Sequence, residues 1–596
     1  MANFPPVPLD IPPGIVKAVS DAGAIGRYVD GDHIRFWQGR PEKIGGWIKY
    51  IAAQTVGVVR GALAWLTADS NRLLALGTYI KAYSVVESLD DITPLRTSGT
   101  LGTDPFAVVD TETTVTVTHT THGITEDGAY VSFSGASAGG GITIDGEYLA
   151  TYINANSYSI EHSAAATSTA TATGGASVTY EYQINAGLPD TAYGLGVGSG
   201  PVGDGTVGTA RTSGGILREM RTWFFDTFGS LLVVHPSGGT IYTWDEPNAA
   251  ARAVAVTNAP SSARASFVTA ERMIVALGTT TPMTMQWCDR DDNTNWTAAT
   301  DSTANTRTLQ TGNRLIAGAR FPGGGGQLFW SDLACYGMQF TSSTDFIYDT
   351  PVLAYRAGLI GPTAFEITRD LVIWLTPDLE VMIYTGTVTK APGFENIQAY
   401  IRTMLDTEKP DKITTGFTPD FSEIWFHYVS LDSTDGEPDR YFKVNTDEWA
   451  WDEGTLGRTA HVNFPTPGGD VVMTGPDRYI YQHEVGYNAD SVALSWSLEL
   501  GRMSLSNRQT ETDLHGFIPD LQRQTGNITV NVKMFERPNS KIEIDDQTFA
   551  IMKDDEIVDM VMGGGYAKFT YSGSSLGCDF RFGTHLLDVG PAGASR

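Results

Sequence analysis

Short apolar and aromatic runs, rather than long amphipathic stripes, dominate this chain. Apolar positions at the helical spacing of 3.6 are nearly absent, whereas β-branched and aromatic runs bounded by Gly, Asp, Asn and Pro recur throughout. Such runs are typical of short strands that are joined by turns. The pattern therefore predicts an all-β fold.

One pattern repeats along the chain: a strand, a turn and a second strand. The copies cover 73–83, 231–244, 273–287, 327–340, 371–384, 424–444 and 471–481. From Leu231 onward they begin about 42 to 55 residues apart, an interval that suits four-stranded propeller blades, each of which covers the hydrophobic face of its neighbour. We expect a β-propeller of six or seven blades over residues 51–99 and 208–486. A stack of separate sandwiches would give similar strands.

The segment between the first two copies differs in composition. Leu73 and Leu231 are 158 residues apart, which is roughly 110 residues more than one blade requires. Residues 100–207 are rich in Thr, Ser, Ala and Gly and alternate in polarity, as in 115–119. We expect a small inserted β-module here, with the glycine-rich stretch 194–208 as a flexible exit.

The two ends of the chain lie outside the repeat. Residues 1–50 are interpreted as an N-terminal arm that enters the first blade. After about Gly486 the repeat stops, and alternating runs at 494–500, 528–534 and 566–571 indicate half-buried antiparallel strands. Residues 487–596 are therefore predicted to form a C-terminal β-domain.

Charge argues against tight binding of nucleic acid. The 596-residue chain has 40 basic and 68 acidic residues, a formal net charge of −28, and affinity for phosphates is built on Lys and Arg. Two interpretations stay open. The acidity keeps a large protein soluble, or it forms a wall past which DNA slides, repelled within roughly 8 Å at physiological salt.

Cysteine usage and hydropathy narrow the class of protein further. Cys288, Cys335 and Cys578 are far apart and odd in number, so neither a disulfide framework nor a zinc site is indicated. No run of 18 apolar residues and no signal peptide is found. We expect reduced thiols, no membrane span and assembly in the cytoplasm.

Two short motifs resemble catalytic or cofactor loops. Residues 573–577 match the Gly-x-Ser-x-Gly elbow, which needs a strand-to-helix turn, but strands are expected on both sides, so a hairpin loop is predicted. Residues 198–203 match the dinucleotide fingerprint without a preceding strand or a following helix, so a linker is predicted.

Two further motifs resemble metal sites. Residues 289–293 begin like a calcium loop, but Thr294 and Thr300 occupy positions that require Gly and Glu, so a turn capped by its own side chains is favoured over a cation site. His119 and His122 have a zinc-like spacing without an identifiable third ligand, which favours the end of a strand.

Glycan chemistry has no clear sequence signature. The Ser-x-Asp-x-Gly turn of sialidase propellers has one partial match, at 433–436, and no carboxylate pair can be assigned.

The aromatic residues of the strands are interpreted as core residues. Residues 323–326 are interpreted as a hairpin turn or a mobile tip. No catalytic residue, metal ligand or cofactor site is named, and the chain is predicted not to be an enzyme.

Several strings resemble a known family. They are residues 10–16, 26–31, 34–37, 39–47, 287–296, 358–362, 372–375, 517–522, 526–527 and 588–593. Together they resemble the nozzle and hub proteins (tail tubular protein B-like) of short-tailed bacteriophages. The resemblance implies a homohexameric ring below the portal and the tail adaptor protein, contacts with tail fibres, and a place in the tail of the virion. The inserted module is a departure from a minimal nozzle.

The function expected from this resemblance is structural. The ring would form an acidic channel that retains genomic DNA and then conducts it during ejection, without binding it tightly. The alternative is a receptor-binding or carbohydrate-active propeller at the tail tip, acting on the host cell surface.

Overall fold

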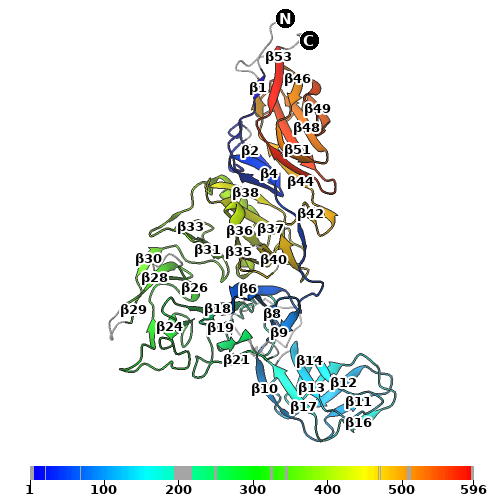
Figure 1. The fold of residues 1–596 in the computed structure, drawn as a ribbon, viewed down its shortest axis with the longest axis vertical. Helices are drawn as coiled ribbons and strands as arrows, with labels where there is room; N and C mark the ends of the chain where they lie inside the picture. Colours follow the sequence, from blue (N-terminus) through cyan, green and yellow to red (C-terminus); the bar gives the residue numbers. More distant parts are fainter. Residues whose placement is uncertain are drawn as a thin grey trace, which may run out of the picture.

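The computed structural model describes residues 6–591 except 21, 68, 126, 193–217, 247–250, 322–325, 342–346, 468, 470 and 506–511. It is almost entirely β, and its one described α-helix is α1 (Glu395–Met404). Figure 1 shows three parts: a sandwich at the top that holds both ends of the chain, a propeller in the middle and a small module at the bottom.

The middle part is a propeller of seven four-stranded blades, which confirms the predicted fold class. Blades 1 to 4 are β6–β9 (Val59–Leu66, Arg72–Thr78, Ala82–Val85, Leu89–Asp91), β18–β21 (Trp223–Phe228, Leu231–Pro236, Tyr242–Trp244, Val254–Ala255), β22–β25 (Ala265–Val268, Ile274–Leu277, Thr284–Trp287, Asn305–Thr308) and β26–β29 (Leu315–Arg320, Gln327–Ser331, Ala334–Phe340, Tyr348–Asp349), with β30 (Val352–Tyr355) also on β28. Blades 5 to 7 are β31–β34 (Phe365–Ile367, Val372–Leu375, Val381–Tyr384, Val388–Lys390), β35–β38 (Thr414–Thr418, Glu423–Tyr428, Arg440–Asn445, Ala450–Gly454) and β39–β41 (Ala460–Asn463, Val471–Thr474, Ile480–His483) with β5 (Trp47–Lys49).

The strand pairs that repeat in the sequence are the second and third strands of the blades. These strands lie between neighbouring blades, so both of their faces are buried and their sequences are almost continuously apolar, as in β23 and β32. Blades pack through large aromatic side chains. Trp330 of blade 4 lies 5.6 Å from Trp374 of blade 5, measured between ring centroids.

The N-terminal arm closes the circle of seven propeller blades. Strand β5 pairs with β41 as the fourth strand of the seventh blade, whose sheet continues into β42 (Asn488–Ala489) and β43 (Val492–Ala493), so the prediction that residues 1–50 enter the first blade is wrong. The chain completes the last blade before it begins the first at β6. Closure of this kind removes a free sheet edge, and a sequence pattern of local hairpins gives no sign of so distant a pairing.

The inserted module is an eight-stranded β unit. Its strands are β10 (Leu95–Thr100), β11 (Phe106–Val108), β12 (Thr114–Thr118), β13 (Ala129–Ser134), β14 (Gly146–Asn154), β15 (Ser157–Glu161), β16 (Ala170–Thr173) and β17 (Thr179–Gln183). Its first strand begins before the predicted boundary at 100, and blade 2 begins at Trp223 rather than at 208. Buried Lys81 of blade 1 pairs with Asp91 of the same blade and with Glu147 of β14, and the second pair holds the module to the propeller.

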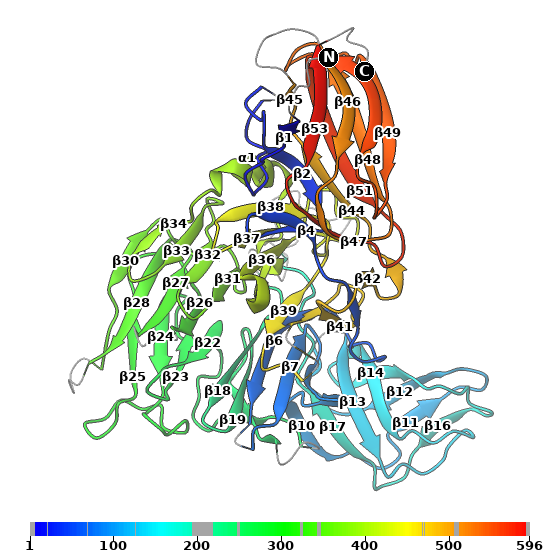
Figure 2. The same cartoon turned by 45° about the horizontal axis from the view of Figure 1, so that its top comes forward.

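The C-terminal part is a sandwich into which the N-terminal strands are woven. Its main strands are β44 (Trp496–Leu500), β46 (Thr512–Ile518), β47 (Leu521–Thr525), β48 (Ile528–Phe535), β49 (Asp545–Ile551), β50 (Val558–Gly564), β51 (Tyr566–Gly573), β52 (Asp579–Phe582) and β53 (Leu586–Pro591). Strands β1 (Val7–Pro8), β2 (Tyr28–Asp32) and β4 (Arg40–Lys43) pair with β53, β44 and β52. Both ends of the chain therefore lie close together (Figure 2).

Candidate functional site

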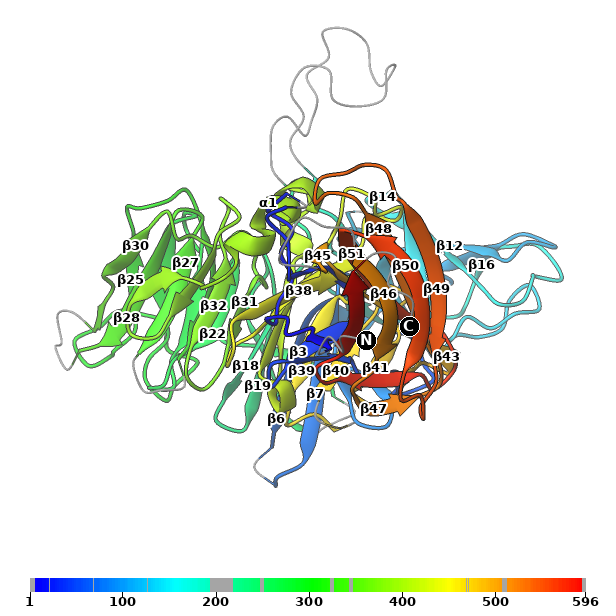
Figure 3. The same cartoon turned by 90° about the horizontal axis from the view of Figure 1, so that it is seen from above.

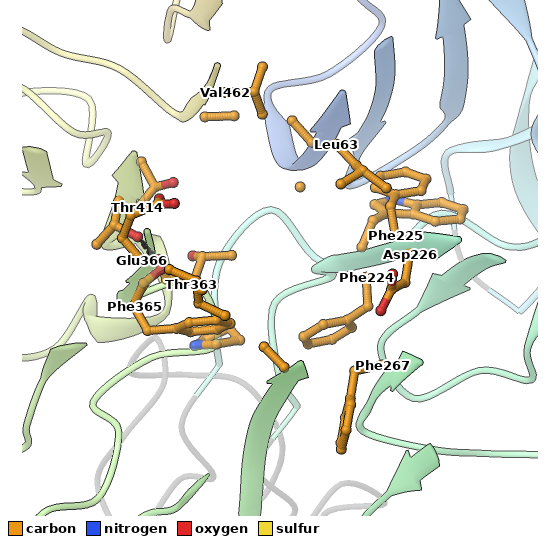
Figure 4. Close-up of a pocket in the computed structure, with 18 of the residues that line it drawn as sticks. Leu63, Phe224, Phe225, Asp226, Phe267, Thr363, Phe365, Glu366, Thr414 and Val462 are labelled. Carbon is orange, nitrogen blue, oxygen red and sulfur yellow. Dashed lines mark hydrogen bonds between the residues drawn. The ribbon is translucent and has the colours of Figure 1, made fainter. Parts of the chain in front are cut away.

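The main cavity of the described chain is the axial channel of the propeller. It has a volume of about 380 Å³ and is lined by residues from the innermost strand of every blade, which are β6, β18, β22, β26, β31, β35 and β39. Figure 4 looks into this channel, with side chains from several blades converging on it. A cavity of this size holds a small ligand and not a DNA duplex.

The channel wall combines small residues, aromatic rings and two carboxylates. Small residues such as Gly61 of β6 and Gly318 of β26 let the strands approach the axis. The phenylalanines of the wall are Phe224, Phe225, Phe267, Phe365 and Phe464. The carboxylates are Asp226 of β18 and Glu366 of β31, which lie on opposite sides of the channel in Figure 4.

The two carboxylates have different surroundings. Asp226 accepts hydrogen bonds from the backbone N–H groups of Thr227 and Val268, each at 2.7 Å, and so ties blade 2 to blade 3. Burial nevertheless raises its pKa. Burial raises the pKa of Glu366 to about 8, opposed only by a hydrogen bond from the backbone of Ile367. An acid without a nearby cation is costly to ionise at this depth.

One end of the channel is surrounded by basic residues at the start of the inner strands. We call Arg60, Arg221, Arg264, Arg314 and Lys412 the basic crown; each stands within two residues of the first residue of an inner strand. Blades 1, 2, 3, 4 and 6 each contribute one member. In the sequence these five residues precede five of the seven predicted hairpins, but their position around an axis was not visible there.

Carboxylates from other parts of the chain neutralise most of this crown. Glu219 accepts hydrogen bonds from both Arg264 and Arg314, the latter at 2.6 Å. Glu437 lies 2.6 Å from Arg60 and 2.9 Å from Lys412. The crown is therefore a set of internal ion pairs rather than an open surface for phosphates.

Glu219 belongs to a segment that covers this end of the channel. Residues 188–192 and 218–222, which we call the stem, are joined by bridges between Leu188 and Met220 and between Ala192 and Arg218. A cavity of about 30 Å³ lies between the stem and the channel and is lined by Met220 together with the channel residue Phe224. Asp190 of the stem also pairs with Lys412, at 2.6 Å.

The sequence motifs that resemble catalytic loops have structural surroundings. Residues 573–577 connect β51 to β52, which belong to different sheets, so the predicted hairpin is wrong although the segment is a turn between strands. The N–H of Cys578 donates to the carbonyl of Ser575 and closes that turn. Residues 198–203 lie outside the described residues, as do 323–325 of the predicted tip between the paired strands β26 and β27.

The motifs that resemble metal sites are occupied by their own hydrogen bonds. Asp289 accepts bonds from the N–H groups of Arg290 and Thr303, as a self-capped turn does. His119 follows the end of β12 and lies 2.6 Å from the hydroxyl of Tyr182, whereas His122 lies 2.7 Å from the carbonyl of Asn154. Among the described residues no group of three or more metal-ligating side chains converges.

Comparison with known proteins gives no family. No protein-family model and no curated protein matches the chain. A solved structure of the dihydro-heme d1 dehydrogenase NirN in complex with DHE aligns over 46% of this chain and 53% of its own, at 10% identity and a TM-score of 0.28. A mitotic checkpoint complex chain aligns over 44% of this chain and 74% of its own, at 10% identity and a TM-score of 0.29. The chain thus aligns with about half the length of the first protein, and these scores carry no argument about function. None of the described helices is long and apolar enough to cross a membrane.

Proposed function

We propose that this chain is a structural subunit of a short-tailed phage tail, a nozzle or hub protein whose copies form a ring. The observation that carries the proposal is where the resembling strings lie. Residues 26–31, 39–47, 517–522 and 588–591 are far apart in the sequence, yet each contributes to the sandwich: β2 pairs with β44, β4 with β52 and β46 with β53. The strings 287–296, 358–362 and 372–375 lie in the propeller, so the resemblance covers both the sandwich and the propeller.

The surface of the propeller is compatible with a ring of identical copies. A closed ring needs two different contact surfaces on each subunit. The outer edge of blade 4 exposes Leu353 and Tyr355, the latter by 70%, and the inserted module exposes Leu149 and Ile153. Figures 2 and 3 place blade 4 and the module on opposite flanks of the molecule. In the proposal these two flanks are the two contact surfaces of each subunit.

In this proposal DNA passes between copies and not through the propeller of one chain. The axial channel is too small for a duplex, so the passage is the opening in the middle of the ring. The net charge of −28 would keep a polyanion from adhering to its wall. The inserted module strengthens this field, because residues 101–185 contain no Lys or Arg.

The test is to assemble virions without this chain. The proposal expects heads that package DNA but lose it, as seen by electron microscopy and by nuclease sensitivity of the genome. Virions that keep their DNA but no longer adsorb to cells would contradict it and support the alternative, a receptor-binding or carbohydrate-active propeller. Restoring the chain from a plasmid should restore retention.

A further inference from the structure

The axial channel holds an acid without a counter-charge. Among the described residues no Lys or Arg forms an ion pair with Glu366, and the only partner recorded for its carboxyl is the backbone of Ile367. Glu366 is half-buried, and Figure 4 shows it on the channel wall. A half-buried carboxyl without a counter-charge is costly to ionise, so it favours its protonated form or a bound cation.

The rest of the wall suits an organic cation better than a metal ion. A divalent ion needs several oxygen ligands at one point, whereas Glu366 and Asp226 lie on opposite walls. The lining of the channel also includes five phenylalanines, with Phe365 beside Glu366 and Phe224 and Phe225 beside Asp226 in Figure 4. Aromatic faces attract ammonium groups and also pack against methylene chains.

The two ends of the channel differ in access. The stem and the basic crown cover the end where the inner strands begin. At the opposite end Arg320 is exposed and Phe464 is 50% exposed, so this mouth is open to solvent. A ligand would enter there and meet both carboxylates inside.

We propose that the axial channel binds a small aliphatic diammonium ion, with one ammonium group at Glu366 and the other at Asp226. The methylene chain would lie against the phenylalanine rings. The cavity of about 380 Å³ has room for such a ligand. The site is independent of the proposed role in the tail.

Binding would be linked to the loss of a proton. Burial raises the pKa of Glu366 to about 8, so the free site holds a proton at neutral pH that an incoming ammonium group displaces. The charged or titratable groups that face the channel besides Glu366 are Asp226 from β18, Arg320 from β26 and His461 from β39. Burial keeps the pKa of His461 well below its ordinary value, so this ring stays neutral.

The experiment is isothermal titration calorimetry of the full chain at pH 7 with 1,4-diaminobutane. The inference expects saturable binding at one site per chain, binding of 1-aminobutane that is at least tenfold weaker, and no binding of 1,4-butanediol. Repeating the titration of the unaltered chain in buffers of different ionisation enthalpy should show a net release of protons on binding. Absence of saturable diamine binding would overturn the inference.

The matched variants are Glu366→Gln and Asp370→Asn. Glutamine keeps the shape of the side chain and removes its charge, so binding should weaken by about 10- to 100-fold. Asp370 is an exposed carboxylate of the same blade, and its variant should bind as the unaltered chain does. Equal weakening by both variants, or unchanged binding by Glu366→Gln in a chain with an unaltered melting temperature, would overturn the assignment to the channel.

Discussion

Arg35 shows how single charged residues join the parts of this molecule. Its guanidinium is 1% exposed and lies 3.5 Å from Glu423 and 3.1 Å from Glu484. Lys443 and Asp452 lie beside the same carboxylate of Glu423, and burial raises the pKa of Asp452 to about 7 despite the neighbouring cations. The network connects the N-terminal strands to blade 6. Its charges are tolerated because each has an opposite partner.

Replacing Arg35 by alanine should strongly destabilise this joint. The change leaves Glu423 and Glu484 with fewer cations in a buried site, which costs about 3 to 5 kcal/mol in the free energy of unfolding. Denaturant unfolding followed by tryptophan fluorescence measures the loss. Arg356→Ala is the control, because Arg356 is 80% exposed and its pair with Asp378 is worth about 1 kcal/mol or less. Equal losses in both variants would contradict the role given to burial.

At this scale the sequence predicted little of the candidate site. Glu366 and Asp226 are two of 68 acidic residues, and nothing in their local sequence distinguishes them. Their depth arises only when strands from blades 2 and 5 meet at an axis. The capped turn that begins at Asp289, in contrast, was predictable, because the Asp289 carboxylate accepts from the N–H of Arg290 and the Asp292 carboxylate accepts from the N–H of Thr294, both local hydrogen bonds.

Among the elements, the middle strands of the blades were predictable and the inner strands were not. Strand β32 is buried throughout and reads as a continuous apolar run, whereas β31 faces the channel and reads as Phe365, Glu366 and Ile367. A strand that packs on one side and lines a cavity on the other carries a mixed pattern. The blade repeat was thus recognised from two strands of each four.

The contact between blades 1 and 2 predicts a sharp effect at Gly77. A Cβ atom at this position would lie 2.2 Å from Cγ of buried Trp223. Because both atoms belong to packed strands, Gly77→Ala should destabilise the propeller by about 1 to 3 kcal/mol. Differential scanning fluorimetry should show a lower melting temperature. Gly102→Ala, where a Cβ meets nothing within 4 Å, should leave it unchanged; a drop of similar size there would contradict the packing argument.

Three histidines between blades 6 and 7 predict a loss of stability in acid. Burial lowers the pKa of His427 to about 3 and keeps the pKa values of His461 and His483 well below the ordinary value. The unfolded chain binds protons at these positions below about pH 6.5, but the folded chain does not. Stability should therefore fall with decreasing pH, by up to about 1.4 kcal/mol per pH unit for each histidine.

A neighbouring arginine strengthens the predicted loss of stability of these histidines in acid. Arg458 donates to His483 at 3.0 Å, and its positive charge adds to burial in lowering the pKa of all three histidines. Melting temperatures measured between pH 7.5 and 5 should show a smaller slope for His461→Gln than for the unaltered chain. His162→Gln in the inserted module should keep the original slope. A melting temperature independent of pH would contradict the account.

For the whole molecule, the division into propeller, module and C-terminal domain was predictable, but the interleaving of its ends was not. Composition marks the module, and the end of the repeat marks the C-terminal domain. The pairing of β1 with β53 and of β5 with β41 joins residues hundreds of positions apart. Short strands of this kind have no local signature, because their partners supply most of their hydrogen bonds.

The proposed ring predicts that the flank of blade 4 is a contact between copies. Tyr355→Asp places a charge on an exposed apolar edge, which should shift the assembly toward single chains by at least tenfold in concentration. Sedimentation velocity measures the shift. Val561→Asp alters a similarly exposed residue of the sandwich, 82% exposed, and should leave assembly unchanged. A Tyr355 variant that assembles normally would contradict this placement of the interface.

The most direct test of the central claim is the shape of the assembled protein, measured by electron microscopy of purified particles together with their mass from light scattering. The account predicts a closed ring of identical copies, six by resemblance, with a central opening wide enough for duplex DNA and lined by acidic groups. A single chain in solution at high concentration, or a ring whose opening is lined by lysine and arginine, would contradict it.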